Sequence, residues 1–159
     1  ENGDINLEPK EININELILE SWSHYKTEAE MKKVSLKCEV NNDMKMMTSA
    51  TEFEQIIRNL LSNAVSYSPG NSVISINVKK NNGIVRLVIS NTAEQLEQDD
   101  LALMFDRLWR KSEARSSSVH SGLGLSLVKA YIDLIGLTIT TELSEYKKLS
   151  INIDGIQSV

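Results

Sequence analysis

Hydrophobic residues alternate with polar ones in some stretches of the chain and recur every three or four positions in others. Alternation is typical of strands with one buried face, whereas recurrence at three and four positions is typical of amphipathic helices. The strongest helical pattern covers Thr51–Tyr67 and ends before Pro69. Ser49 or Thr51 can cap the start of this helix.

Hairpins and single helices are interleaved along the chain, without the strict strand-helix-strand alternation of a doubly wound sheet. Asn81-Asn82-Gly83 predicts one such hairpin, because Asn and Gly accept the positive φ of a tight turn. The order predicts an α+β fold, a two-layer α/β sandwich with one mixed sheet covered on one face by helices. The expected strands are Glu11–Ile14, Val34–Val40, Met44–Met47, Val73–Val78, Ile84–Ile89, Thr138–Thr141 and Leu149–Ile153, and the expected helices are Asn15–Ala29, Thr51–Tyr67, Asp99–Phe105 and Gly122–Ile135.

The boundaries of the folded part follow from the same pattern. Residues 1–10 are polar and predict an N-terminal lead-in, so that residues 11–159 form a single domain. Residues from about 107 to 121 are polar and show no hydrophobic periodicity, which predicts a loop. A loop of this length is typical of a functional segment.

Composition narrows the class of protein. The 159 residues fit one domain, and 22 acidic against 17 basic residues give a net charge of −5. This acidity argues against nucleic acid as a partner. Cys38 is the single cysteine, which excludes a disulfide framework and a cysteine-rich metal site. No apolar run approaches the length of a membrane span, so direct membrane contact by this segment is not expected.

Two asparagines inside the strongest helix are candidates for chemistry. Asn59 and Asn63 lie four positions apart and Tyr67 continues the same stripe, so the three share one helix face. Asn is a poor residue in the middle of a helix, but amide oxygens can coordinate a hard cation such as Mg²⁺. The spacing alone favours a solvated polar face over a cation site.

Two of the seven glycines, Gly122 and Gly124, open the last predicted helix directly after the polar loop. Glycine permits close approach of a ligand, and the free N–H groups of a first helical turn attract anions. The pattern is neither a dinucleotide fingerprint nor a P-loop, and a tight turn into a helix explains it equally well.

Three segments together are more specific than any one of them. Arg58-Asn-Leu-Leu-Ser-Asn-Ala-Val-Ser-Tyr-Ser-Pro69 resembles the N box of sensor histidine kinases, Phe105-Asp-Arg-Leu-Trp-Arg110 their F box, and Gly122-Leu-Gly-Leu-Ser-Leu-Val128 their G2 box. Their order and spacing also match. The chain therefore resembles the catalytic ATP-binding domain of these kinases, in the GHKL superfamily, whose Bergerat-type fold agrees with the predicted architecture.

The resemblance implies a role for each matching residue. Asn63 takes the place of the asparagine that coordinates Mg²⁺, and Asn59 is a second catalytic position. ATP-hydrolysing relatives carry a glutamate at the position of Asn59 that activates water. An amide has no basic site near neutral pH, so Asn59 favours phosphoryl transfer over hydrolysis. Tyr67 matches a tyrosine beside the adenine, and the loop at about 107–121 matches the ATP lid.

The sequence departs from the family pattern in two places. Ser66 stands where the family usually has a lysine, and Arg110, Lys111 or Arg115 could supply the missing positive charge. The slot of the G1 box reads Asn91-Thr92-Ala93-Glu94-Gln95, without its aspartate and both glycines. We expect Asn91 to accept the adenine amino proton without charge assistance, in an intact pocket of weaker affinity. The nucleotide-binding residues implied by the resemblance are Asn63, Tyr67, Asn91, Leu96, Arg110, Lys111, Arg115, His120, Ser121, Gly122, Leu123, Gly124 and Leu125.

The implied function is binding of ATP and Mg²⁺ and presentation of the γ-phosphate to a histidine on a separate dimerisation domain, followed by transfer to a response regulator. His24 lacks the acidic neighbour and proline expected of a phosphoacceptor, so the chain alone is not expected to autophosphorylate. The family's parents are membrane-anchored bacterial sensors with this domain in the cytoplasm. Two alternatives stay open: a degenerate, pseudokinase-like module with weak or no ATP binding, and a GHKL ATPase or anti-sigma-type serine kinase.

Overall fold

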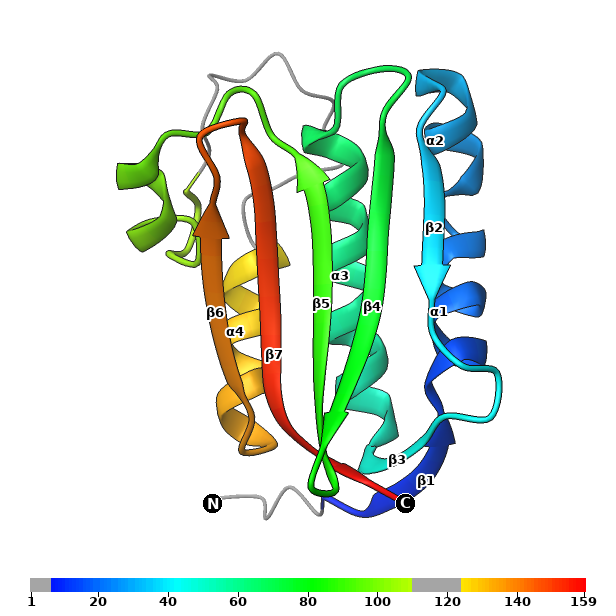
Figure 1. Cartoon of the computed structure of the whole chain (residues 1–159). Helices are drawn as coiled ribbons and strands as arrows, with labels where there is room; N and C mark the ends of the chain where they lie inside the picture. The colour runs from blue at the N-terminus through cyan, green and yellow to red at the C-terminus, as the bar shows by residue number, and fades with distance from the viewer. Residues whose placement is uncertain (1–6, 110–123) are drawn as a thin grey trace.

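The computed structural model describes residues 7–109 and 124–159, which form one seven-stranded mixed sheet with helices against one of its faces (Figure 1). The strand order is β1-β3-β7-β5-β4-β2. The seventh strand, β6, also pairs with β7, next to the short stretch in which β3 pairs with β7. Only β2 and β4 run parallel. The strands are β1 (Pro9–Asn13), β2 (Ser35–Glu39), β3 (Lys45–Ser49), β4 (Val73–Asn81), β5 (Ile84–Thr92), β6 (Thr138–Leu143) and β7 (Lys148–Ser158); the helices are α1 (Ile14–Ser23), α2 (Lys26–Lys32), α3 (Ala50–Tyr67), the 3₁₀ helix η1 (Gln98–Ala102) and α4 (Gly124–Leu134).

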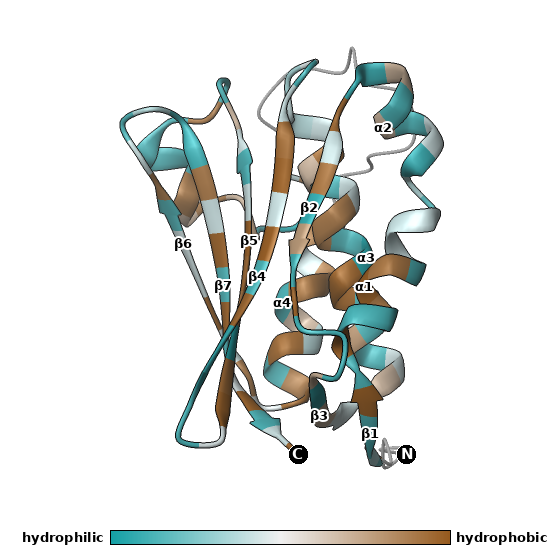
Figure 2. Cartoon of the chain, turned by 45° about the vertical axis from the view of Figure 1, so that its right-hand side comes forward, coloured by the Kyte–Doolittle hydropathy of each residue, from teal (hydrophilic) through white to brown (hydrophobic). Residues whose placement is uncertain are grey.

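The hydrophobic core lies between the sheet and the helices α1, α3 and α4. Strand residues alternate between buried apolar positions and polar positions on the open face, as the colouring along β4 and β7 in Figure 2 shows. The helices turn their apolar stripes toward the sheet, with Phe53, Ile57 and Leu61 of α3 at 0% exposure. The predicted α+β architecture, a mixed sheet covered on one face, is therefore confirmed.

The helix α3 forms over almost the range that its periodicity predicts. Its apolar residues are buried along one side, and Asn59, Asn63 and Tyr67 are half-buried along another. Ser49 occupies the N-cap position, but its side chain makes no cap hydrogen bond, so capping by its hydroxyl is not observed. The chain turns extended at Ser68, because the following proline disfavours helical geometry there.

The prediction of a single helix over residues 15–29 is wrong, because the structure has two helices there, with a break at His24 and Tyr25. The backbone N–H of His24 bonds to Ser21 O and that of Tyr25 to Trp22 O, three residues back. The hydroxyl of Ser23 also donates to Glu20 O at 2.5 Å. These short-range bonds tighten the last turn of α1 and end it, and α2 begins at Lys26.

The last strand is longer than predicted. The expected end at Ile153 precedes Asp154-Gly155, a typical turn pair, yet β7 continues to Ser158. Gly155 adopts a φ of +93°, and the β5–β7 register shifts between Val85 and Leu87, which is a β-bulge. The predicted β4–β5 hairpin is confirmed, since Asn82 and Gly83 have φ values of 50° and 78°. Within the two described ranges, no helix is both long and apolar enough to cross a membrane.

Candidate functional site

The polar stripe of α3 faces the beginning of α4. Asn59, Asn63 and Tyr67 follow one another at four-residue intervals on an observed helix, so the predicted common face exists. The side-chain nitrogen of Asn63 is buried and has no hydrogen-bond partner among the described residues. A buried amide of this kind costs free energy unless a ligand satisfies it.

The side chain of Asn59 lies where a side chain at position 124 would begin, so α3 and the start of α4 approach each other there. The Nδ2 atom of Asn59 donates to Gln55 O at 2.8 Å, which turns Oδ1 away from its own helix. A Cβ atom added to Gly124 would lie 3.2 Å from that Oδ1 and 3.9 Å from Cγ. Glycine at this position therefore admits the Asn59 side chain and lets the start of α4 approach α3.

The slot of the G1 box begins with Asn91 and Thr92, the last two residues of β5, and continues into the loop that follows. Asn91 is 4% exposed, and its Nδ2 donates to Thr92 O at 3.0 Å. Because that bond uses a donor of the amide, Oδ1 points the opposite way as an acceptor. Leu96 is fully buried, as is Ala93. No residue from 91 to 97 has a positive φ, so the loop follows a path that needs no glycine.

Lys147, in the turn between β6 and β7, fastens this loop and was not singled out from the sequence. Its carbonyl accepts from Ala93 N at 2.8 Å, and its Nζ donates to Leu96 O at 2.6 Å. The same ammonium lies 3.0 Å from the carboxylate of Glu97. A lysine in a turn carries no periodic signal, and its partners lie about fifty positions away, so sequence patterns could not reveal it.

Lys32 makes a second unpredicted contact, at the C-terminal end of α3. Its Nζ donates to Val65 O at 2.6 Å and to Ser66 O at 3.2 Å, which satisfies carbonyls that the helix end leaves free. Burial lowers the pKa of the Lys32 ammonium, and the Glu28 carboxylate opposes this effect. The contact places a positive charge beside Ser66, although it reaches the backbone rather than the face of Asn63.

Several predicted binding residues lie outside the described part of the chain. This holds for Arg110, Lys111, Arg115, His120, Ser121, Gly122 and Leu123, and for all of the predicted lid beyond Trp109. Of the remaining ones, Leu125 is 8% exposed and packs in the core, so its backbone rather than its side chain is available to a ligand.

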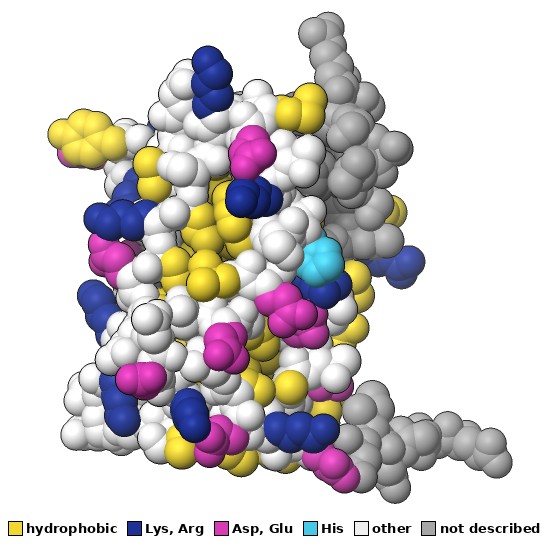
Figure 3. All heavy atoms as spheres, turned by 90° about the vertical axis from the view of Figure 1, so that its right-hand side faces the viewer, with side chains coloured by type: hydrophobic (Ala, Val, Ile, Leu, Met, Phe, Trp, Pro, Cys, Tyr) yellow, Lys and Arg dark blue, Asp and Glu magenta, His cyan; other side chains and the backbone are white. Residues whose placement is uncertain are grey.

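His24 lies at the surface, where charged side chains of both signs are spread over the face seen in Figure 3. Its Nε2 is 2.9 Å from a guanidinium nitrogen of Arg58, which in turn pairs with Glu54 at 2.7 Å. A guanidinium can only donate, so Nε2 of His24 is the acceptor. This hydrogen bond holds the imidazole against Arg58 at the surface; that His24 is not a phosphoacceptor stays a prediction.

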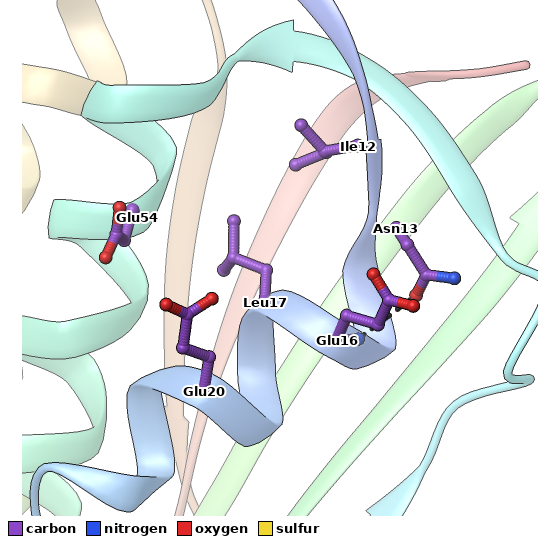
Figure 4. Close-up of a pocket in the computed structure, with 6 residues that line it drawn as sticks. All are labelled: Ile12, Asn13, Glu16, Leu17, Glu20 and Glu54. Atoms are coloured by element: carbon purple, nitrogen blue, oxygen red, sulfur yellow. Dashed lines mark hydrogen bonds between the residues drawn. The ribbon is translucent and has the colours of Figure 1, made fainter.

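A pocket at the other end of the helical layer is separate from this site. It has a volume of about 230 Å³ and is lined by Ile12, Asn13, Glu16, Leu17, Glu20 and Glu54 (Figure 4). Among the described residues, no group of three or more His, Cys, Asp or Glu side chains is placed to hold a metal ion. The side-chain oxygen that the structure places beside the start of α4 is Oδ1 of Asn59.

The fold is an α+β domain in which an asparagine on the polar stripe of α3 lies against the glycine that opens α4. The family described as Histidine kinase-, DNA gyrase B-, and HSP90-like ATPase matches residues 48–154. The chain belongs to this family, and it is the ATPase domain of a sensor histidine kinase.

Similar proteins agree with this assignment. The sensor protein CzcS of Cupriavidus metallidurans is 31% identical over 137 residues, which is 86% of this chain and 28% of CzcS. This chain therefore spans less than a third of that relative. The catalytic domain of histidine kinase ThkA superposes with a TM-score of 0.78 at 23% identity and covers 92% of this chain and 94% of that one. Full-length ShkA in complex with AMPPNP superposes with a TM-score of 0.82 at 16% identity, and the match covers 98% of this chain and 32% of the ShkA chain.

Proposed function

We propose that this domain binds ATP with Mg²⁺ and presents the γ-phosphate to a phosphoacceptor histidine on a separate helical dimerisation domain of its parent kinase. The observation that carries the proposal is the buried, unpartnered amide of Asn63 on the helix face that meets the start of α4. Asn63 Nδ2 is one of five buried side-chain N or O atoms without a partner among the described residues, and it lies on the same helix face as Asn59, which lies against the start of α4. Because it is a donor, it suits an acceptor such as a phosphate oxygen of a triphosphate, and the Oδ1 of the same amide suits a cation.

The start of α4 supplies the second half of a phosphate site. The first N–H groups of a helix are free to donate, and the helix dipole favours negative charge there. The contact between Asn59 and Gly124 brings these groups next to the α3 stripe. Asn59 has no basic atom at neutral pH, which favours transfer to a protein group over hydrolysis by water. Rate enhancement then comes from positioning and electrostatics.

The donor set fits a magnesium ion bound together with phosphates. Mg²⁺ takes few protein ligands and keeps water and substrate oxygens, so one amide oxygen of α3 together with phosphate oxygens suits it. Asn63 would hold the ion, and Asn59 would lie beside it. When bound, the ion would neutralise phosphate charge.

Asn91 gives the site a preference for adenine. Since Nδ2 of Asn91 is held by Thr92 O, its Oδ1 can accept from the 6-amino group of adenine and would repel the 6-oxo group of hypoxanthine or guanine. Replacing Asn91 by alanine is expected to weaken ATP binding by about 1–3 kcal/mol and, because the repulsion of the 6-oxo group is removed as well, to leave inosine triphosphate bound at least as tightly as before. Calorimetric titration with both nucleotides measures this difference. Equal weakening of both would contradict the role of Asn91 in reading the base.

The decisive experiment is a titration of the domain with ATP, with and without Mg²⁺, compared between the unaltered chain and Asn63→Ala. We expect saturable binding that Mg²⁺ strengthens, and about tenfold weaker binding for the variant with most of the Mg²⁺ effect lost. Asn81→Ala, an exposed asparagine at the hairpin end of β4, is the matched control and should bind normally. Normal binding by Asn63→Ala would remove the basis of the proposal.

A second candidate is a degenerate module that signals through protein contacts without nucleotide. The loop without glycines after β5 and the absence of a lysine side chain at position 66 favour it. The same titration separates the two candidates, because this module would show no binding of ATP at millimolar concentration.

The partners follow from the proposed transfer. A structure of ThkA in complex with the response regulator protein TrrA is known, and its kinase chain superposes with a TM-score of 0.76 at 22% identity. By analogy, we infer a response regulator as the final acceptor here. We also infer a cytoplasmic location for this domain within a membrane-anchored bacterial parent.

A further inference from the structure

One residue holds both ends of the turn that follows β5. The N–H of Leu96 bonds to Ala93 O at 3.1 Å, which closes a four-residue turn. The carbonyl of Lys147 accepts from the N–H at the start of this turn, and the ammonium of Lys147 donates to the carbonyl at its end. Main chain and side chain of a single lysine therefore clamp residues 93–96 against the β6–β7 turn.

The clamp itself is held in a fixed conformation. Lys147 has a φ of +62°, and its N–H bonds to Ser144 O at 3.0 Å. The hydroxyl of Ser144 accepts from Lys148 N at 3.1 Å, and Ser144 N bonds to Lys148 O at 3.0 Å. These bonds close the turn at its base, so the ammonium starts from a backbone with little freedom.

The clamped turn lies directly beside the residue proposed to read the base. Asn91 and Thr92 pair with Leu149 and Lys148 at the end of the sheet, and the clamped turn begins at the next residue. Leu96 is fully buried, so displacement of its backbone would also displace a side chain from the core. The carbonyl that holds the Asn91 amide, Thr92 O, belongs to the peptide bond that leads into this turn, so the path of residues 93–96 affects that contact.

We propose that Lys147 is a positioning residue that determines nucleotide specificity, because it fixes the loop after β5 in the absence of the glycines that this loop would otherwise use. The inference rests on the proposed binding of ATP and adds the residue that keeps its adenine-reading edge in place. The bond to the carbonyl of Leu96 is the essential contact. The ion pair with Glu97 is secondary, since that carboxylate is 68% exposed.

The test compares the affinities for ATP and inosine triphosphate, which share sugar and phosphates and differ at position 6 of the base. Lys147→Met keeps the length of the side chain without its donor, and we expect the ATP-to-inosine-triphosphate preference to fall about tenfold, the effect of one charge-assisted hydrogen bond. Lys147→Arg restores a donor and should recover most of the preference. Lys148→Met, at the exposed neighbouring lysine, should match the unaltered domain.

Glu97→Gln separates the two contacts of the ammonium. It removes the ion pair and leaves the bond to Leu96 O, so its nucleotide preference should stay within about twofold of the unaltered domain. An unchanged preference in Lys147→Met, or parallel weakening of both nucleotides, would overturn the inference. A loss in Glu97→Gln as large as in Lys147→Met would also overturn it. If the unaltered domain prefers ATP and Asn91→Ala does not, the proposed function stands, whatever the result for the Lys147 variants. If the unaltered domain does not bind ATP, the proposed function and the role of Lys147 are both contradicted.

Discussion

Substitution of Gly124 is expected to weaken ATP binding in proportion to the size of the new side chain. An alanine Cβ would lie 3.2 Å from Asn59 Oδ1, which forces the two helices or the amide apart by a few tenths of an ångström. Valine adds two methyl groups beyond that atom. We expect about tenfold weaker binding for Gly124→Ala and about a hundredfold for Gly124→Val, measured by calorimetry.

A double mutant isolates the contact from any general effect on folding. Once the amide of Asn59 is removed, the Cβ of an alanine at position 124 has no non-local neighbour within 3.4 Å among the described residues, so Gly124→Ala in an Asn59→Ala background should not lower the melting temperature further. It should also cause little further loss of ATP affinity there. Gly136→Ala is the control, since Gly136 has a φ of +76° and nothing within 4 Å of its added Cβ. That change should lower stability and leave binding intact. Additive effects of the Asn59 and Gly124 changes would contradict the contact.

Restoring the aspartate that the family usually has at position 91 is expected to destabilise this chain. Asn91 is 4% exposed, and its Nδ2 donates to Thr92 O. Aspartate would replace that donor by a second acceptor and place a charge in a buried site. At pH 7 we expect Asn91→Asp to lower the free energy of unfolding by about 3 kcal/mol.

The pH dependence identifies the cause of this loss. Burial against a carbonyl raises the pKa of the new carboxyl above its value in the unfolded chain, about 3.9. The folded state then binds the proton more tightly, so the deficit is full above the raised pKa and shrinks as the pH falls through it. Urea unfolding at several pH values measures this, with Asn91→Ala as a control whose deficit stays constant. Full stability of Asn91→Asp at pH 7 would mean that a donor reaches this position.

Periodicity predicts the elements of this fold well where one face of a helix or strand is buried, as in α3 and β4. It fails where single hydrogen bonds decide. The break between α1 and α2 depends on bonds at His24 and Tyr25, and the extension of β7 depends on the backbone freedom of Gly155 opposite β5. Neither feature changes the hydrophobic pattern, so the pattern cannot report it.

In the candidate site, too, helical spacing predicts some features and single contacts decide others. Asn59, Asn63 and Tyr67 share a face because helical spacing requires it, and the sequence motif is sufficient to place them together. The contact of Gly124 with Asn59 joins two helices, and the contacts of Lys147 and Lys32 reach backbone carbonyls far along the chain. Every residue has the same backbone carbonyl, so a sequence pattern cannot show which carbonyl a distant lysine binds.

The clamp at Lys147 also bears on how such a domain can evolve. In a loop shaped by glycines, each glycine must be retained on its own, because any side chain there distorts the backbone. In a loop held from a neighbouring turn, the exposed positions 94 and 95 can vary, while a single distant lysine becomes indispensable. A lineage that acquired the lysine first could then lose the glycines one at a time without losing the nucleotide.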